Sequence, residues 1–370
     1  MRKVVAAMDS MKGCLDSLSA SRAIASGIIG QDADIEVVCV PVADGGEGTA
    51  EALAFGNSNC EKQVTKVSGP LGEEIMAEWY YDEESGTAFI DMAVAAGLAL
   101  VEESKRDPLR TTTYGVGELI MEAVEKGAKK ILLGLGGSAT VDGGVGALSA
   151  MGLIEPEALP PKQTIQTETD SISEKIEKGG VELLLLCDVS APFTGQRGAA
   201  RVFGPQKGAS AEDVEALEAR LEEIRSKVKE VRGIDLNDVP GSGAAGGLAG
   251  GLMAFAGGKI VKGASVVLDA IGFNDIIEGA NLIITGEGSS DQQTLMGKIP
   301  YEILQRGKRK DVLVWLVAGR ICDCEALLDA GFERIICINS PEIVLRSDTE
   351  GQDPMDPEIA SRRLGAFYKN

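Results

Sequence analysis

The stretch LLGLGGSATVDGGVGAL, residues 132–148, begins as a short apolar run and continues as a loop of glycines with one serine, one threonine and one aspartate. Glycine loses more conformational freedom on folding than any other residue, so a dense run indicates that the backbone approaches something closely. A phosphate, a sugar or another stretch of backbone would each require this. A buried strand followed by such a loop is typical of α/β proteins, which bind ligands at the carboxyl ends of their strands.

The same pattern recurs along the chain. Short β-rich apolar runs alternate with longer amphipathic or alanine-rich segments, which predicts a parallel sheet covered by helices. Several runs, such as LLLLC and LIIT, are continuous rather than alternating, as expected for strands buried on both faces. The predicted strands are Lys3–Ala7, Glu36–Val40, Ala88–Asp91, Lys130–Leu135, Val181–Cys187, Asn281–Thr285, Val312–Val317 and Arg334–Ile338. The predicted fold class is therefore α/β.

One helix is clear from its periodicity. In AEDVEALEARLEEIRSKVKEV, residues 211–231, apolar side chains recur at spacings of three and four, and Ser210 with Asp213 offers an N-terminal cap. Residues 241–258, GSGAAGGLAGGLMAFAGG, predict a helix that packs very close to a neighbour and is entered through a glycine loop. Residues 155–180 and 346–358 are polar and are predicted to be exposed.

Composition excludes several function classes. The formal net charge of −21 argues against a nucleic-acid partner or an anionic membrane surface. The chain has no histidine, which excludes Ser-His-Asp and Cys-His catalysis and histidine-ligated zinc. At 370 residues the chain is longer than one hydrophobic core usually serves, so two domains are expected.

The seven cysteines are scattered, and most lie in or beside apolar runs. We interpret them as reduced thiols of a cytoplasmic protein. The N-terminus, MRKVVAAMDS, has an apolar run of about five residues, shorter than the roughly 7–15 residues that a signal peptide needs. It is predicted to form the first strand.

Acids follow the predicted strands. Asp9, Asp44, Asp142, Asp188 and Glu287 each come at or soon after the end of an apolar run. A carboxylate in this position often caps the following helix, which is the structural alternative for each one. Five together predict a metal-binding or acid/base cluster at the carboxyl edge of the sheets, with Mg²⁺ as the metal that suits oxygen ligands.

Basic residues occupy similar positions. Lys12, Lys207 and Lys298, with Arg197 and Arg201, lie near glycines or turns. Together with the acids and glycine loops they predict a site for phosphate groups and Mg²⁺. The familiar phosphate motifs are missing, because no G-x-x-x-x-G-K-[ST] occurs and GLGGSA lacks the last glycine of G-x-G-x-x-G.

The chain resembles the type 1 glycerate kinase family in ten segments that occur in the family's order. These are DSMKGCL, VPVADGGEGT, VSGPLGE, AFIDMAVAAGL, RDPLRTTTYGVGELI, GLGGSATVDGGVGAL, CDVSAPF, GAARVFGPQKGA, PGSGAAGGLAGGLMAF and TGEGSSDQQTLMGKIP. The resemblance implies phosphorylation of D-glycerate with ATP and Mg²⁺, mainly to 2-phosphoglycerate. It also implies two α/β domains, with a Rossmann-like sheet built from both chain ends (residues 1–62 and 275–370), an inserted domain (63–274) and an active site in the cleft between them.

The resemblance and the patterns above yield one set of candidate site residues. Asp188 is expected to be the base that accepts the substrate hydroxyl proton, with Lys207 and Asp142 as further catalytic candidates. Asp44 and Glu287 are the candidate Mg²⁺ ligands. The candidate binding residues are Asp9, Lys12, Asp44, Gly45, Gly46, Gly136, Gly137, Ser138, Thr140, Arg197, Arg201, Gln206, Glu287, Asp291 and Lys298.

Several positions depart from the family's pattern. They include Asp16, Ala191, Ser289, Ser290 and Met296. These departures leave open a non-catalytic glycerate or nucleotide sensor, or a kinase for a related small hydroxy acid. A Mg²⁺-dependent phosphatase is less favoured, because no predicted strand ends in Asp-x-Asp. The sequence is compatible with a homodimer.

Overall fold

The computed structural model describes residues 2–11, 13–154, 176 and 180–339. The chain forms two compact units, Met1–Asp44 with Ala264–Asn370, and Gly45–Gly263. The second unit is thus an insertion in the first, and its ends lie at 44/45 and 263/264, where the sequence analysis placed them at 62/63 and 274/275. The polar segments expected at 155–180 and 346–358 lie almost wholly or wholly outside the described residues.

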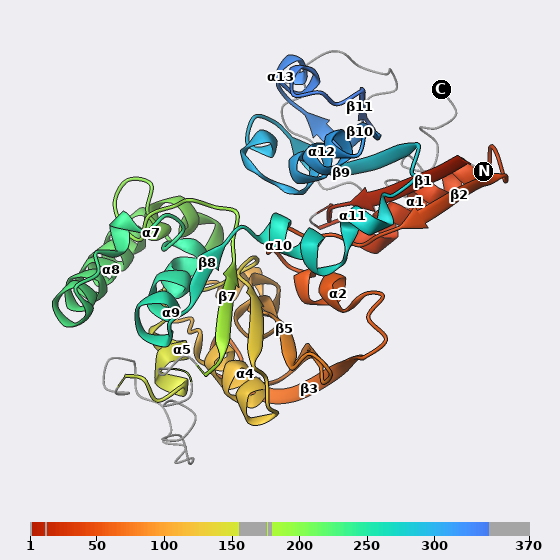
Figure 1. Ribbon diagram of the computed structural model, residues 1–370. Coiled ribbons are helices and arrows are strands. Elements are labelled where there is room, and N and C mark those ends of the chain that lie inside the picture. The colour runs from red at the N-terminus through yellow and green to blue at the C-terminus, as the bar shows by residue number, and fades with distance from the viewer. Residues whose placement is uncertain (1, 12, 155–175, 177–179, 340–370) are drawn as a thin grey trace. The chain divides into compact units, whose positions relative to one another are not determined.

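The first unit is built on a parallel sheet. Its described strands are, in spatial order, β2 (Ile35–Cys39), β1 (Arg2–Met8), β9 (Leu282–Ser290), β10 (Leu313–Ile321) and β11 (Arg334–Cys337). All four pairings are parallel. Figure 1 shows the red N-terminal and blue C-terminal strands in this one sheet. The structure therefore confirms a Rossmann-like sheet made from both chain ends.

Both faces of this sheet are covered, which explains the continuous apolar runs. Val4, Ala6 and Met8 pack with α1 (Ser17–Ile29) on one face. Val5 and Ala7 pack on the other face with α12 (Ile299–Arg309). The remaining helices on that side are α10 (Gly263–Ala270), α11 (Phe273–Ile276) and α13 (Cys324–Asp329).

The second unit has a mixed sheet. Its described strands run in the order β3 (Cys60–Ser68), β4 (Glu74–Asp82), β5 (Thr87–Asp91), β6 (Lys130–Gly134), β7 (Glu182–Leu186) and β8 (Lys259–Val261). The first three strands are antiparallel, and β5 to β8 are parallel. Strands β3, β4 and β8 were not predicted from the sequence. Strand β3 is largely polar and β8 has only three residues, whereas the alternation of the buried Ala77, Trp79 and Tyr81 could have identified β4.

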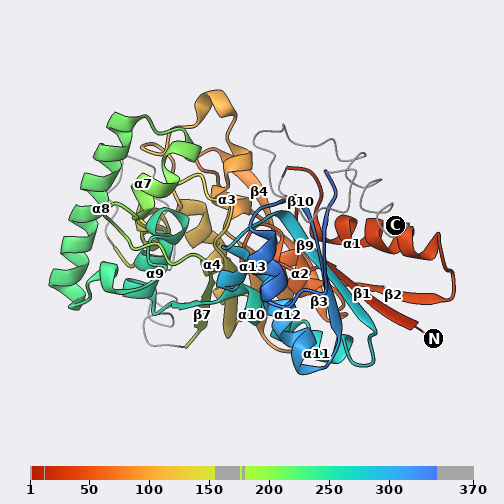
Figure 2. The same cartoon turned by 90° about the horizontal axis from the view of Figure 1, so that it is seen from above.

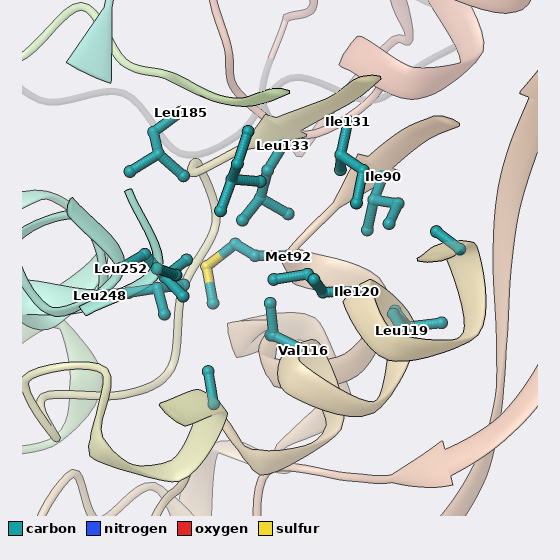
Figure 3. Packing of buried hydrophobic residues seen from close by; sticks show 14 of the residues in the cluster. Ile90, Met92, Val116, Leu119, Ile120, Ile131, Leu133, Leu185, Leu248 and Leu252 are labelled. Carbon is teal, nitrogen blue, oxygen red and sulfur yellow. The ribbon is translucent and has the colours of Figure 1, made fainter. Parts of the chain in front are cut away.

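The core of this unit lies between the parallel strands and two helices. Figure 3 shows Ile90, Leu133 and Leu185 of β5 to β7 near Ile120 of α4 and Leu252 of α9, and all belong to one buried cluster. Within the described residues, the α-helices of the unit include α2 (Thr49–Ala54), α3 (Ala93–Ala96), α4 (Tyr114–Glu125), α5 (Val145–Ala150), α7 (Ala199–Phe203), α8 (Ala211–Arg232) and α9 (Leu248–Ala256).

The two helices predicted from the sequence are present. Helix α8, at the outer side of this unit in Figure 2, begins with the expected capping box of Ser210 and Asp213. Helix α9 packs against neighbouring backbone: a Cβ atom added to Gly251 would lie 2.4 Å from the carbonyl oxygen of Gly143. The small residues of 241–258 therefore permit close backbone packing, as predicted.

Candidate active site

In the first unit, the strand order places a ligand-binding edge between β1 and β9. Counted within the unit, the order is 2-1-3-4-5, and in such open sheets ligands bind outside the carboxyl ends of the strands where the order reverses. Asp9 follows β1 directly, and its backbone N–H donates to the carbonyl oxygen of Gly286 in β9, at 2.8 Å. Asp9 and the adjacent Glu287 therefore share this edge.

Glu287 accepts several hydrogen bonds at this edge. Its side chain is buried, with 5% exposed. One carboxylate oxygen accepts from the hydroxyls of Ser290 (3.1 Å) and Thr294 (2.5 Å), and the other accepts from Lys298 Nζ at 3.1 Å. Glu287 is thus held by three donors. Ser290, one of the departures from the family's pattern, supports this acid directly.

Lys298 is a fixed positive charge at the start of α12. Its half-buried side chain lies beside Glu287, 3.1 Å away. Burial, the largest single influence, acts to lower the pKa of Lys298, but the Glu287 carboxylate opposes this and the net pKa is raised above its ordinary value. Asp291 and Asp44 act in the same direction. Lys298 is therefore an ammonium group at neutral pH.

Asp291 and Asp44 complete the acidic surroundings of Lys298. Asp291 Oδ1 accepts from the backbone N–H of Gln293 at 2.7 Å, so it shapes the turn before Thr294. Asp44 is half-buried at the end of the first segment of this unit. Lys12, another expected binding residue, lies outside the described residues.

In the second unit, the parallel neighbours β5, β6 and β7 form a comparable carboxyl edge. Asp91 ends β5, the glycine loop 134–144 follows β6, and Asp188 follows β7 by two residues. Asp188 Oδ1 accepts from the backbone N–H of Gly263, the first residue of α10, at 2.9 Å. The expected base therefore contacts the N-terminus of a helix, but this helix lies 75 residues later in the chain and is not the one that follows β7.

Asp142 lies inside the glycine loop and is fully buried. Its carboxylate accepts from the backbone N–H and hydroxyl of Thr113 (both 2.8 Å), and from the backbone N–H groups of Gly144 (3.0 Å) and Gly146 (3.2 Å). These bonds join the glycine loop to the start of α4. The geometry fits an acid that fixes the loop.

Lys207 lies beneath the same loop, with 2% of the residue exposed. Its Nζ donates to Ser138 Oγ and to the carbonyl oxygen of Thr140, both at 2.7 Å. Burial lowers the pKa of Lys207 to about 7, although Asp142 acts to raise it. Lys207 therefore binds the glycine loop from the interior of the protein, through an amine that can gain or lose a proton near neutral pH. Thr140 is also fully buried, whereas Ser138 is half-buried.

Several glycines of the loop that begins at Gly45 and of the loop 134–144 are required by close contacts between backbones. A Cβ atom on Gly136 would lie 2.3 Å from Gly46 Cα, and one on Gly45 would lie 2.6 Å from the carbonyl oxygen of Leu186. Gly136 N–H also donates to the carbonyl oxygen of Gly45 at 3.0 Å. Gly137, by contrast, is exposed and has φ of 73°. Of the three explanations left open by the sequence, backbone packing holds for Gly45, Gly46 and Gly136.

The remaining basic candidates lie at the surface of the second unit. Arg201 forms a bidentate ion pair with Glu215 of α8, so its guanidinium is directed to that helix. Arg197 and Gln206 are exposed.

Sequence reasoning missed Asp91. This residue is 6% exposed, and burial raises its pKa to about 7. Its position at the carboxyl end of a predicted strand follows the same regularity as the five acids that were singled out, so the pattern could have identified it.

A preformed metal site is not evident in the part of the chain that the structure describes. No group of three or more Cys, Asp or Glu side chains there could bind an ion. Both carboxylate oxygens of Glu287 already accept from cationic or hydroxyl donors. Among the described helices, none combines the length and apolar character needed to span a bilayer.

Two α/β units, each with polar groups at the carboxyl edge of parallel strands, are typical of α/β proteins that bind small ligands. The sequence model of the Glycerate kinase family matches residues 4–354. A glycerate kinase of Halalkalibacterium halodurans is 38% identical over 98% of this chain and 97% of its own length. A glycerate 2-kinase of Escherichia coli is 40% identical over 87% of this chain and 86% of its own.

The comparison with solved structures agrees. A crystal structure of a Salmonella typhimurium LT2 protein assigned as a glycerate kinase 2 matches with a TM-score of 0.73 at 32% identity, over 99% of this chain and 96% of that one. The chain therefore belongs to the glycerate kinase family. It is a kinase, that is, a phosphotransferase.

Proposed function

We propose that this enzyme transfers the γ-phosphoryl group of ATP to the 2-hydroxyl of D-glycerate, giving 2-phosphoglycerate and ADP. Family membership across residues 4–354 carries the proposal. The 2-position is supported by the 40% identical relative, which is a glycerate 2-kinase. A glycerate kinase uses ATP as its phosphate donor, and phosphoryl transfer needs positioning and charge neutralisation more than covalent chemistry by the protein.

The candidate side chains fall into two sets: some are accessible to ligands, and others are buried and hold the glycine loop in place. Lys298 is half-exposed and permanently charged, so it suits a phosphate or the glycerate carboxylate. Ser138 and the backbone of Gly137 are accessible in the loop above Lys207 and suit a second anionic group. We assign Asp142 and Lys207 to the support of this loop, because both are buried and bonded to it.

Asp188 is our proposed base for the glycerate hydroxyl. It is half-buried at the end of β7, and one of its oxygens is fixed by Gly263 N–H. If it accepts the proton, Asp188→Asn should lower kcat by roughly 10²–10⁴-fold. A loss below about threefold would contradict this role.

Mg²⁺ is proposed to arrive with ATP and to neutralise charge on its phosphates. Mg²⁺ keeps several waters and commonly takes only one or two protein carboxylates, so the lack of a larger cluster among the described residues is compatible with it. Asp44 and Glu287 are the proposed carboxylate ligands, and Glu287 would have to give up at least one of its three present donors to bind the ion.

The test is an assay of ADP release with ATP, MgCl₂ and D-glycerate, with L-glycerate, EDTA and no acceptor as controls, followed by ³¹P NMR of the product. Turnover that needs D-glycerate and Mg²⁺ and yields the 2-phosphate is expected. Lys298→Ala should reduce kcat/KM strongly, whereas Lys259→Ala, at the exposed surface, should not. Binding of ligands without turnover, or turnover only with another hydroxy acid, would overturn the proposal.

We also propose a cytoplasmic location, which the seven free cysteines support. A homodimer stays a prediction, and light scattering after size-exclusion chromatography would test it.

A further inference from the structure

Asp91 is a buried carboxylate that neither the family's motifs nor the proposed chemistry above gives a role. It is the last residue of β5 and pairs with Gly134 of β6. Its Oδ2 accepts from Gly48 N–H at 2.9 Å and its Oδ1 from Ala50 N–H at 3.1 Å. A Cβ atom on Gly134 would lie 2.5 Å from Asp91 Oδ1, so the missing side chain of Gly134 provides the space for this carboxylate.

The segment that Asp91 binds is part of the contact between the two glycine loops. Gly45 accepts from Gly136 N–H at 3.0 Å, and Gly46 lies so close to Gly136 that a Cβ there would be 2.3 Å from its Cα. A shift of loop 45–48 must therefore move the start of loop 134–138, because no side chain lies between them to absorb it.

We propose that Asp91 is a positioning residue, whose carboxylate anchors loop 45–48 and through it fixes the backbone of loop 134–138 for the reaction. Asp91 does not contact the reacting atoms. The catalytic part of this inference rests on the proposed function, in which loop 134–138 binds an anionic group.

The charge state of Asp91 should control this anchor. Burial raises its pKa to about 7, with the two N–H bonds opposing and the charges of Glu47 and Glu51 adding to the rise. Tyr80 of β4 is a titratable group that also interacts with Asp91. A carboxylate accepts hydrogen bonds from N–H groups more strongly than a neutral carboxyl group. The anchor should therefore weaken as the pH falls below about 7.

The test compares Asp91→Asn with a matched variant, Asp82→Asn. Asp82 is similarly buried and accepts from the backbone N–H groups of Glu84 and Ser85, but it ends β4 and pairs with Thr87 at the opposite end of β5. Two readouts are needed: amide hydrogen exchange of Gly48 and Ala50, and the pH profile of kcat/KM.

We expect Asp91→Asn to speed exchange at Gly48 and Ala50 at least about tenfold, to lower kcat/KM about tenfold and to remove an acid limb near pH 7. Asp82→Asn should change neither readout at this loop, and Asp91→Glu should restore part of the activity. Unchanged exchange in Asp91→Asn would overturn the anchor. Faster exchange with unchanged kcat/KM would overturn the positioning role.

Hydrogen exchange also separates this inference from the proposed function. If the wild-type protein shows no turnover with D-glycerate, the proposed function fails while the exchange result still decides whether Asp91 anchors the loop. If Asp91→Asn does not fold, hydrogen exchange of the wild-type protein at different pH values tests the anchor instead. Its protection of Gly48 and Ala50 should fall between pH 8 and pH 6, whereas protection of Glu84 should not, and equal behaviour would overturn the proposal.

Discussion

The four hydrogen bonds to Asp142 predict a measurable loss of stability in Asp142→Asn. The amide oxygen can replace Oδ2 and still accept from Thr113 and Gly146, but the amide NH₂ then faces the N–H of Gly144. Leaving one buried donor without an acceptor costs about 1–3 kcal/mol. Replacing three bonds to a charged acceptor by bonds to a neutral one costs about 1 kcal/mol each.

An amide is also cheaper to bury than a carboxylate, which offsets part of this cost. We therefore expect the second unit to lose about 2–4 kcal/mol of unfolding free energy. The protein has two tryptophans, and the buried Trp79 lies in this unit. In a Trp315→Phe background, urea unfolding followed by tryptophan fluorescence reports on the second unit alone.

Asp238→Asn is the control, because Asp238 is an exposed acid of the same unit. Its effect should stay within about 0.5 kcal/mol. If Asp142→Asn had an effect as small as this, the bonds to Thr113, Gly144 and Gly146 would not fix the loop. A large loss of kcat with unchanged stability would indicate instead that Asp142 acts directly in the reaction.

Three further outcomes follow from the same contacts. Gly136→Ala should destabilise the second unit by about 1–3 kcal/mol and reduce kcat/KM, because its Cβ would overlap the facing loop, as urea unfolding and the ADP-release assay would show. The pKa of Lys207 is lowered to about 7 in the folded protein, so the unfolded chain binds more protons between pH 7 and 10.5. The free energy of unfolding should therefore rise with pH over this range, by at most about 1.4 kcal/mol per pH unit. Lys207→Met should remove this rise in unfolding experiments across the same range. Glu287→Gln should destabilise the first unit by roughly 1–3 kcal/mol in urea, since it leaves the half-buried Lys298 ammonium without its anionic partner.

Most of the strands that could be predicted from the sequence are apolar runs buried on both faces, such as β1, β5 and β6. All eight predicted strands are present, and apolar runs such as Leu183–Leu186 have buried side chains on both faces of the sheet, as their sequence indicates. Strand β3 was missed because Val67 is its only buried residue and its sequence, CEKQVTKVS, is mostly polar and shows no apolar alternation. The edge strands β2 and β11, by contrast, were recognised because each keeps a short apolar run.

The sequence indicated where along the strands the candidate residues lie, but not which contacts their side chains make. The rule that acids follow strands placed Asp9, Asp142 and Glu287 at carboxyl edges, as found. It could not show that Asp142 is enclosed by Thr113, 29 residues earlier in the chain, or that Lys207 binds under Ser138, 69 residues away. A lysine next to a glycine turn has the same local sequence whether its amine faces solvent or the interior. Only the tertiary contacts decide this.

The charge distribution leads to a last prediction, on salt. The protein carries a formal net charge of −21, and the half-exposed Lys298 ammonium is paired with Glu287. In the proposed function, ATP approaches against a long-range repulsive field and is bound by short-range contacts with Lys298 and backbone N–H groups. The Debye length falls from about 30 Å at 0.01 M to about 8 Å at 0.15 M salt, so screening removes the repulsion before it weakens those contacts.

The association rate of ATP should consequently rise with ionic strength over this range, the opposite of what a basic nucleotide site would show. Stopped-flow measurements with a fluorescent ATP analogue in sodium chloride and in tetramethylammonium chloride would test this, since agreement between the salts excludes a specific ion effect. A rate that falls with salt in both would mean that local positive charge outweighs the net field at the site. Because Lys298 is paired with Glu287, it could not supply this excess positive charge by itself. A residue outside the described ranges, such as Lys12, would then have to contribute positive charge to the ATP site.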